Sequence, residues 1–311
     1  MGRKIVKLLM VPVIIASLCI MFYPAFSDWW NARRQSQLLS DYESYVQAME
    51  KEDFSAEWAK ARAYNAKIRE NNIYGDVFSA DRTGSLEQDY KDVLNVAGNG
   101  VMGYIEIPKI DIKIPIYHGV GDDVLQDGAG HMPGVKLPIG QTDSNTVLCA
   151  HRGLPSSRLF TDIDQLGAGD LIQIHVLDET FYYKVEKIWA MVDKQDMDTM
   201  QDALSIEEGR DLVSLFTCTP YGVNSHRLIV RCERYIPGPG DDILDVISSE
   251  GMLKLVKNGN AVMVAAGVAG VLILVALWSL QGYVIRYNRI RKDRKQAGNP
   301  AKQDKKGGTK P

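Results

Sequence analysis

The chain of 311 residues lacks an excess of either charge. Its 36 Lys and Arg residues are balanced by 39 Asp and Glu residues, which gives a formal net charge of -3. Domains that bind nucleic acids carry a strongly basic patch or stripe, so we predict no nucleic-acid partner. The basic residues gather instead in the two tails, and the middle of the chain carries most of the acids.

Charged residues are missing altogether from two apolar segments, Leu8–Phe26 and Ala261–Leu280. The hydrocarbon core of a bilayer is about 30 Å thick and needs roughly 20 helical residues to cross. We therefore expect the second segment to span a membrane rather than to form a buried core helix. Six basic residues follow it between Arg286 and Lys295, and the positive-inside rule then predicts a cytoplasmic C-terminal tail.

The first apolar segment has two interpretations. Its basic start and the Ala25–Ser27 triplet are typical of a secretory signal with a cleavage site, but the segment exceeds the usual apolar region of about 7–15 residues. Trp29 and Trp30 suit a membrane interface. We interpret the segment as an uncleaved anchor, with a cleavable signal as the alternative. Under either interpretation, the middle of the chain is exported.

Cysteine is scarce, with four in the chain. Cys19 lies in the first apolar segment, which leaves Cys149, Cys218 and Cys232 in the exported part. An odd number of cysteines in an oxidising compartment points to a thiol outside any disulfide, and such a thiol is a candidate reactive group.

Glycine and proline are absent from residues 31–71, a segment rich in strong helix formers. Apolar residues such as Leu38, Tyr42 and Tyr45 recur there at helical spacing. We predict a helical hairpin that is broken near Asp53 and Ser55 and packs against the following domain.

From Gly100 the pattern changes to short β-type segments separated by Gly and Pro. The expected strands are Met102–Ile107, Ile110–Tyr117, Thr146–Ala150, Leu171–Val176, Phe181–Val192, Leu212–Cys218 and Arg227–Arg231. Seven or eight strands in about 135 residues, with one short helix near Leu159–Leu166, predict a closed or nearly closed β-barrel.

Residues that can carry out acyl transfer lie at the ends of these strands: His151 and Cys218 each follow or end a strand, and Arg227 begins the next one. A thiolate is the nucleophile of such a reaction, and a nearby imidazolium or guanidinium lowers the thiol pKa. The histidine can protonate a leaving amine, and the arginine can hold the developing oxyanion. A zinc site from Cys149, His151 and Cys218 is the alternative, but their spacing is poor for a metal site. We predict a catalytic set without metal or other cofactor.

The segments around these residues resemble the sortase family, in particular its class C, pilin-polymerising group. Ser214–Cys218 is similar to the TLxTC signature, with Ser for the first Thr, and Cys218–Arg227 is similar to the class C segment around the catalytic Cys and Arg. His151–Pro155 resembles the segment with the catalytic His. The resemblance covers roughly residues 103–234 and includes two further motifs, Gly128–Gly134 and Leu159–Asp162.

This resemblance implies an eight-stranded barrel and cleavage of an LPxTG-like sorting signal between Thr and Gly. A thioester on Cys218 would pass the acyl group to a lysine amine of a pilin subunit, and Thr217 of the signature would bind substrate. Two alternatives stay open. The acceptor is a cell-wall peptide amine, or the protein is a non-catalytic, membrane-tethered adhesin or scaffold.

Class C enzymes also carry a lid with an Asp-Pro-aromatic motif before the barrel. The corresponding residues are Asp76, Val77 and Phe78, so Val replaces the Pro. We predict Asp76 and Phe78 as lid residues, with Arg227 as the basic partner of Asp76; a solvated loop is the alternative. Strand alternation places Cys149 on the face of His151, where we expect it to pack structurally.

We therefore expect a mainly β protein: a sortase-type, eight-stranded barrel with an N-terminal helical hairpin, flanked by two transmembrane helices. The catalytic domain would be extracellular on a Gram-positive cell membrane. The expected segments are a signal anchor (1–30), a helical region (31–73), a lid-bearing loop (74–99), the catalytic barrel (100–236), a linker (237–260), a transmembrane helix (261–281) and a basic cytoplasmic tail (282–311).

Overall fold

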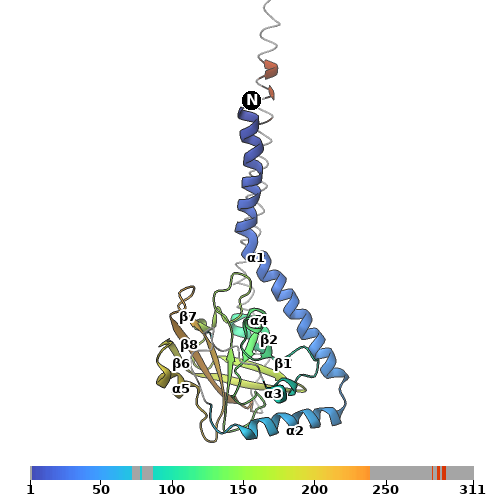
Figure 1. Ribbon diagram of the computed structural model, residues 1–311, viewed down its shortest axis with the longest axis vertical. Coiled ribbons are helices and arrows are strands. Elements are labelled where there is room, and N and C mark those ends of the chain that lie inside the picture. The colour runs from blue at the N-terminus through green and yellow to red at the C-terminus, as the bar shows by residue number, and fades with distance from the viewer. Residues whose placement is uncertain are drawn as a thin grey trace, which may run out of the picture. The chain divides into compact units, whose positions relative to one another are not determined.

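A computed structural model of the chain describes residues 2–71, 78 and 87–238, together with six positions between 282 and 291; for residues 2–14 it describes the backbone alone. The chain divides into two compact units, residues 1–257 and 258–311. The first unit contains all the strands described below (Figure 1).

Eight strands close into a barrel in the order β1-β2-β3-β4-β7-β8-β6-β5. The strands are β1 (Val101–Ile107), β2 (Ile112–His118), β3 (Ala129–His131), β4 (Ser144–Cys149), β5 (Leu171–Val176), β6 (Glu179–Asp193), β7 (Asp211–Thr219) and β8 (His226–Tyr235). Pairing is parallel between β2 and β3 and between β4 and β7, and antiparallel elsewhere. The predicted mainly β barrel is thus confirmed. β3 was not among the expected strands, because three residues are too few to show an alternating pattern.

The barrel wall has an apolar core on each face where β4 and β7 run. Leu148 and Leu215 belong to the interior core, which receives residues from every strand. Val147 and Phe216, one position away, belong to a second, outer core. Burial on both faces explains why consecutive residues are apolar in both strands, at 147–149 in β4 and at 215–216 in β7.

In the described part of the first unit, five helices and two short 3-10 turns accompany the strands. They are α1 (Gly2–Ala48), α2 (Lys51–Lys67), α3 (Gln88–Asp92), α4 (Asp122–Asp127), α5 (Met197–Leu204), η2 (Pro108–Ile110) and η3 (Ile163–Gln165). Leu125 of α4 and Met200 of α5 cover the outer core. The single turn α3 lies in the segment expected to be a loop, and the helix expected near residues 159–166 is reduced to η3.

The helical hairpin breaks earlier than predicted, between Ala48 and Lys51. Glu50 is the N-cap of α2, and the backbone N–H of Glu50 donates to Asp53 Oδ2 at 3.4 Å, so the two residues form a capping box. Asp53 therefore stabilises the start of α2 instead of ending α1. Ser55 lies inside α2, where its hydroxyl donates to the Lys51 carbonyl at 3.1 Å.

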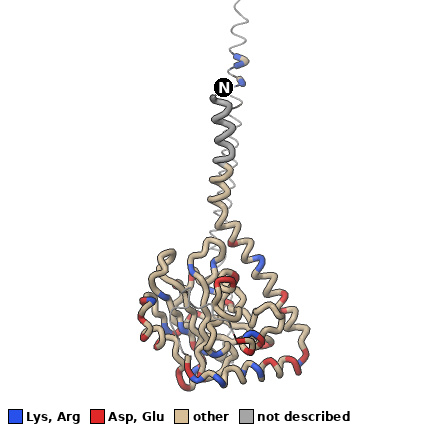
Figure 2. The backbone as a smooth tube through the Cα atoms, in the orientation of Figure 1, with Lys and Arg blue, Asp and Glu red and all other residues tan. Residues whose placement is uncertain are grey.

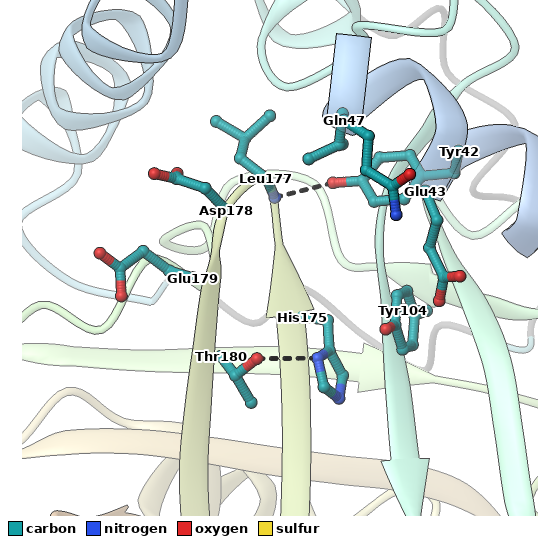
Figure 3. Close-up of a pocket in the computed structure, with 10 residues that line it drawn as sticks. Tyr42, Glu43, Gln47, Tyr104, His175, Leu177, Asp178, Glu179 and Thr180 are labelled. Atoms are coloured by element: carbon teal, nitrogen blue, oxygen red, sulfur yellow. Dashed lines mark hydrogen bonds between the residues drawn. The ribbon is translucent and has the colours of Figure 1, made fainter. Parts of the chain in front are cut away.

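Tyr42 fastens α1 to the barrel. Its hydroxyl accepts a hydrogen bond from the Leu177 N–H at 2.8 Å and donates to the Met102 carbonyl at 3.3 Å. Figure 3 shows the ring reaching from α1 to the turn between β5 and β6, above the stacked rings of Tyr104 and His175. A cavity of about 260 Å³ lies at this junction.

The part of α1 nearer the N-terminus forms hydrogen bonds with the loop that follows β4 and with α4. Asn31 Nδ2 donates to the Ser156 carbonyl at 2.7 Å, and Asp28 Oδ1 accepts from the Arg158 N–H at 3.0 Å. Gln35 Nε2 donates to the Asp127 carbonyl at 2.9 Å. α1 is therefore bonded to the barrel at separate points along its length.

Charged residues of both signs are interspersed over the barrel (Figure 2). Arg210 pairs with Glu186, Glu207 and Glu233, and Arg231 shares the first two of these glutamates. This network neutralises positive charge on the surface of β8 instead of leaving a basic stripe.

Among the residues whose structure is described, no helix combines the length and apolarity needed to cross a membrane. The expected second membrane segment, Ala261–Leu280, lies outside the described residues. The side chains at the start of the first segment, up to residue 14, lie outside them too.

Tyr42→Phe should lower the free energy of unfolding by about 1–3 kcal/mol, because it leaves a buried N–H and a buried carbonyl without their partner. Chemical denaturation measures the change. Tyr45→Phe, on the same helix but with 53% of its side chain exposed, should stay within about 0.5 kcal/mol of wild type. Equal stability of the two variants would contradict the fastening role of Tyr42.

Candidate active site

The hairpin of β7 and β8 sets the cysteine beside the arginine. Cys218 is directly opposite Arg227 in the antiparallel register. Side chains at opposite positions share one face, with Cβ atoms about 4.5–5.5 Å apart. Only 6% of Cys218 and 3% of Arg227 are exposed. The two residues thus lie side by side on one face of the hairpin, both largely removed from water.

The parallel pairing of β4 with β7 brings the histidine to the same place. The last paired residues are Cys149 and Phe216, and the Ala150 N–H still donates to the Phe216 carbonyl at 3.3 Å. If this register continued for two more positions, it would bring His151 alongside Cys218. Neighbouring strands are about 4.8 Å apart, so the three predicted catalytic residues meet at adjacent strand ends.

Phe78 covers this meeting point. Its ring centroid lies 5.7 Å from that of His151, and the Arg227 Cζ lies 5.5 Å from it. On a third side the ring stacks on Phe216, with centroids 5.8 Å apart and an interplanar angle of 8°. The structure therefore places this predicted lid residue against two predicted catalytic side chains. Asp76 and Val77 lie outside the described residues.

Burial and charge determine the protonation chemistry of the site. Burial lowers the pKa of His151 below its ordinary value, and the carboxylate of Asp122 opposes this shift. The imidazole is therefore mainly neutral at pH 7 and can accept a proton from the thiol. Arg227 Nη1 donates to the carbonyls of Asn224 at 3.0 Å and His226 at 2.7 Å. These carbonyls orient the guanidinium of Arg227.

The loop after His151 needs glycine at position 153. Gly153 has φ +83°, and a Cβ there would lie 3.1 Å from the ring of Tyr221. Its N–H donates to Thr161 Oγ1 at 3.2 Å, and the Phe160 N–H donates to the His151 carbonyl at 3.1 Å. These hydrogen bonds connect residues 160 and 161 with residues 151 and 153, so the loop folds back towards His151.

Thr217 faces the barrel interior, with no exposed surface. Its hydroxyl donates to the Ala150 carbonyl at 2.7 Å, so any substrate contact would run through its backbone; substrate binding by Thr217 stays a prediction. Cys149 is fully buried and packs in the outer core beside Val147 and Phe216.

Two other histidines have structural contacts. His131 is fully buried between the Tyr90 hydroxyl at 2.8 Å and the Lys136 carbonyl at 3.1 Å, and burial lowers its pKa to about 3. His118 bonds the carbonyls of Gly100 and Val93. Within the described residues, no group of three or more His, Cys, Asp or Glu side chains is placed to hold a metal ion.

Arg152 is a further residue near the site that no sequence pattern indicated. Its side chain is 9% exposed, and its guanidinium donates to the hydroxyl of Thr219, the residue after Cys218, at 2.9 Å. Its position next to His151 is the only sequence signal for this contact.

Comparison with known proteins agrees with this geometry. The model of the Sortase domain family matches residues 105–235. A crystal structure of sortase C1 from Streptococcus agalactiae is 39% identical, with a TM-score of 0.57, over 65% of this chain and 100% of that one. The structure described as a pilus-related sortase C of Group B Streptococcus is 34% identical, with a TM-score of 0.56, over 65% and 98% of the two chains.

Sortase D of Bacillus subtilis (strain 168) is 29% identical over 119 residues, which are 38% of this chain and 54% of that protein. The chain spans about half the length of the curated relatives it matches. The chain belongs to the sortase family of cysteine transpeptidases. This confirms the family that the motifs indicated, and its structural neighbours are sortases of class C.

Phe78→Ala should raise the rate at which iodoacetamide alkylates Cys218 several-fold, because the ring no longer covers the site. Removing this cover also moves the His151 pKa up towards its ordinary value, since burial is what lowers it. Mass spectrometry of the peptide with Cys218 measures the rate at each pH. Val223→Ala, which shortens a side chain 69% exposed in the β7–β8 loop, serves as the control. An unchanged rate in folded Phe78→Ala would show that the ring does not guard the thiol.

Proposed function

We propose that the protein is a membrane-anchored class C sortase that joins pilin subunits. It cleaves an LPxTG-like sorting signal between Thr and Gly and transfers the acyl group to a lysine amine of a pilin. The observation that carries this proposal is the pairing of Cys218 with Arg227 across the β7–β8 hairpin, with the ring of Phe78 in contact with both Arg227 and His151. A non-catalytic adhesin has no need of this buried juxtaposition.

The geometry supports a two-step acyl transfer. Cys218 Sγ attacks the Thr carbonyl of the signal while its proton passes to the neutral imidazole of His151. Arg227 stabilises the negative oxygen that forms. The bond to the Gly nitrogen then breaks, and the protonated imidazole gives its proton to the leaving amine. A lysine amine attacks the resulting thioester, loses a proton to His151, and releases the thiolate.

A pilin acceptor is favoured by two observations. The similar structure from Group B Streptococcus is described as pilus-related. Phe78 also lies against His151 and Arg227, where a lid of the kind expected for class C would lie. A cell-wall peptide amine is the competing acceptor, and transfer assays with both amines separate the two.

The membrane anchoring rests on the sequence. Leu8–Phe26 and Ala261–Leu280 contain no charged residue, and basic residues follow the second segment closely. In this arrangement the barrel is extracellular and the C-terminal tail is cytoplasmic.

Cys218→Ala should abolish cleavage of an LPxTG-like peptide and its covalent capture, because Cys218 is the cysteine directly opposite Arg227. Cys149→Ala should keep most of the activity, since Cys149 packs in the outer core. Intact-protein mass spectrometry detects the thioester. A covalent adduct on purified Cys218→Ala would disprove the assignment of the nucleophile.

Arg227→Lys should lower turnover at least tenfold, because loss of one oxyanion donor typically costs about 10²–10³ in rate and an ammonium cannot copy the planar fork of a guanidinium. Arg231→Lys is the matched control, since Arg231 lies further along β8 and pairs with Glu186 and Glu207. Near-normal turnover of folded Arg227→Lys would rule out a geometric role for the guanidinium.

A further inference from the structure

The backbone pairing that aligns the site stops short of the histidine. β4 ends at Cys149, whereas its partner β7 continues to Thr219. His151 therefore lies two residues beyond the last ladder pair, in a segment that has already left the sheet. Other contacts must hold its imidazole within reach of the thiol.

Beyond the last backbone pair of β4 and β7, hydrogen bonds from side chains connect the two segments. Immediately before the histidine and the cysteine, the Thr217 hydroxyl donates to the Ala150 carbonyl at 2.7 Å. Immediately after them, Arg152 Nη1 donates to Thr219 Oγ1 at 2.9 Å. One bond precedes the pair and one follows it, so the two bonds bracket the pair.

Every nitrogen of the Arg152 guanidinium has an acceptor. Nε donates to the Thr161 carbonyl at 3.1 Å and Nη2 to Asp164 Oδ2 at 2.5 Å, in addition to the bond to Thr219. Only 9% of the side chain is exposed. The group thus joins the end of β7, the loop after β4 and η3, and it is already engaged rather than directed at a substrate. A lysine ammonium cannot reproduce this planar fork.

We propose that Arg152 is a positioning residue for the transpeptidation. It ties the segment after His151 to the residue after Cys218 and so keeps the imidazole at proton-transfer distance from the thiol. The role of Arg152 rests on the proposed function of the pair. A displacement of about 1 Å in such a pair can lower the rate about 100-fold, although Arg152 itself touches neither substrate nor reacting atoms.

The test removes the hydrogen bond between Arg152 and Thr219 in two ways: Arg152→Lys changes the donor, and the near-isosteric Thr219→Val removes the acceptor. Each variant should lose at least about tenfold in kcat on a sorting-signal peptide, with KM changed less than about threefold. The dependence of the Cys218 alkylation rate on pH should also change, because the imidazole of His151 is no longer held at proton-transfer distance from the thiol. The other charged groups near that imidazole, Asp122 and Arg227, are unaltered in both variants.

A double-mutant cycle separates positioning from general support of the loop. If the Arg152–Thr219 bond is what matters, Thr219→Val should reduce kcat less than about twofold further in the Arg152→Lys background, since residues that act through one contact are not additive. Arg158→Lys is the matched control, because Arg158 pairs with Asp162 in the same loop and is 44% exposed. It should leave kcat and the pH profile unchanged.

Two results would overturn the proposal: a folded Thr219→Val with wild-type turnover and a wild-type alkylation profile, or losses of the two variants that multiply independently. Thermal unfolding establishes that each variant is folded, and Thr219→Val decides alone if Arg152→Lys is not. Absence of turnover in the wild type on every sorting-signal peptide would instead refute the proposed function. The alkylation profiles would still decide whether Arg152 couples the two side chains.

Discussion

The parallel pairing of β4 with β7 is the constraint on which the candidate site depends. Parallel strands end on the same edge of a sheet, so the residues after β4 arrive beside the last residues of β7. The antiparallel strand β8 then starts from that edge and brings Arg227 opposite Cys218. Apolar cores on both faces of these strands hold their ends in register, so the chemistry at the edge depends on packing well away from it.

Burial acts on the site in two opposing ways. It makes the guanidinium of Arg227 a strong electrostatic partner for a thiolate, because charges interact more strongly away from water. It also disfavours the charged form of His151, and the ring of Phe78 stands over both groups. The described arrangement therefore combines a buried Cys218 beside Arg227 with an aromatic cover over the neighbouring side chains.

The strands that carry the site were predictable because each is an apolar run bounded by polar or turn-forming residues. β7 was expected at residues 212–218 and occupies 211–219. Elements with a weaker local signal were missed, such as β3, with three residues, and α5, with eight. The helix break was misplaced because Asp53 was interpreted as a breaker, whereas it belongs to a capping box. Arg152 could not be recognised in advance, since its contact with Thr219 joins residues 67 positions apart.

The bonds between α1 and the loop after β4 have a practical consequence for anyone who trims the protein to make it soluble. Asp28 and Asn31 lie a few residues beyond the first apolar segment, yet they bond Arg158 and Ser156, in the loop that begins at His151. A shortened protein that starts after Asn31 lacks these partners, and one that starts before Asp28 keeps them. The two fragments therefore differ in the contacts that hold the loop after His151.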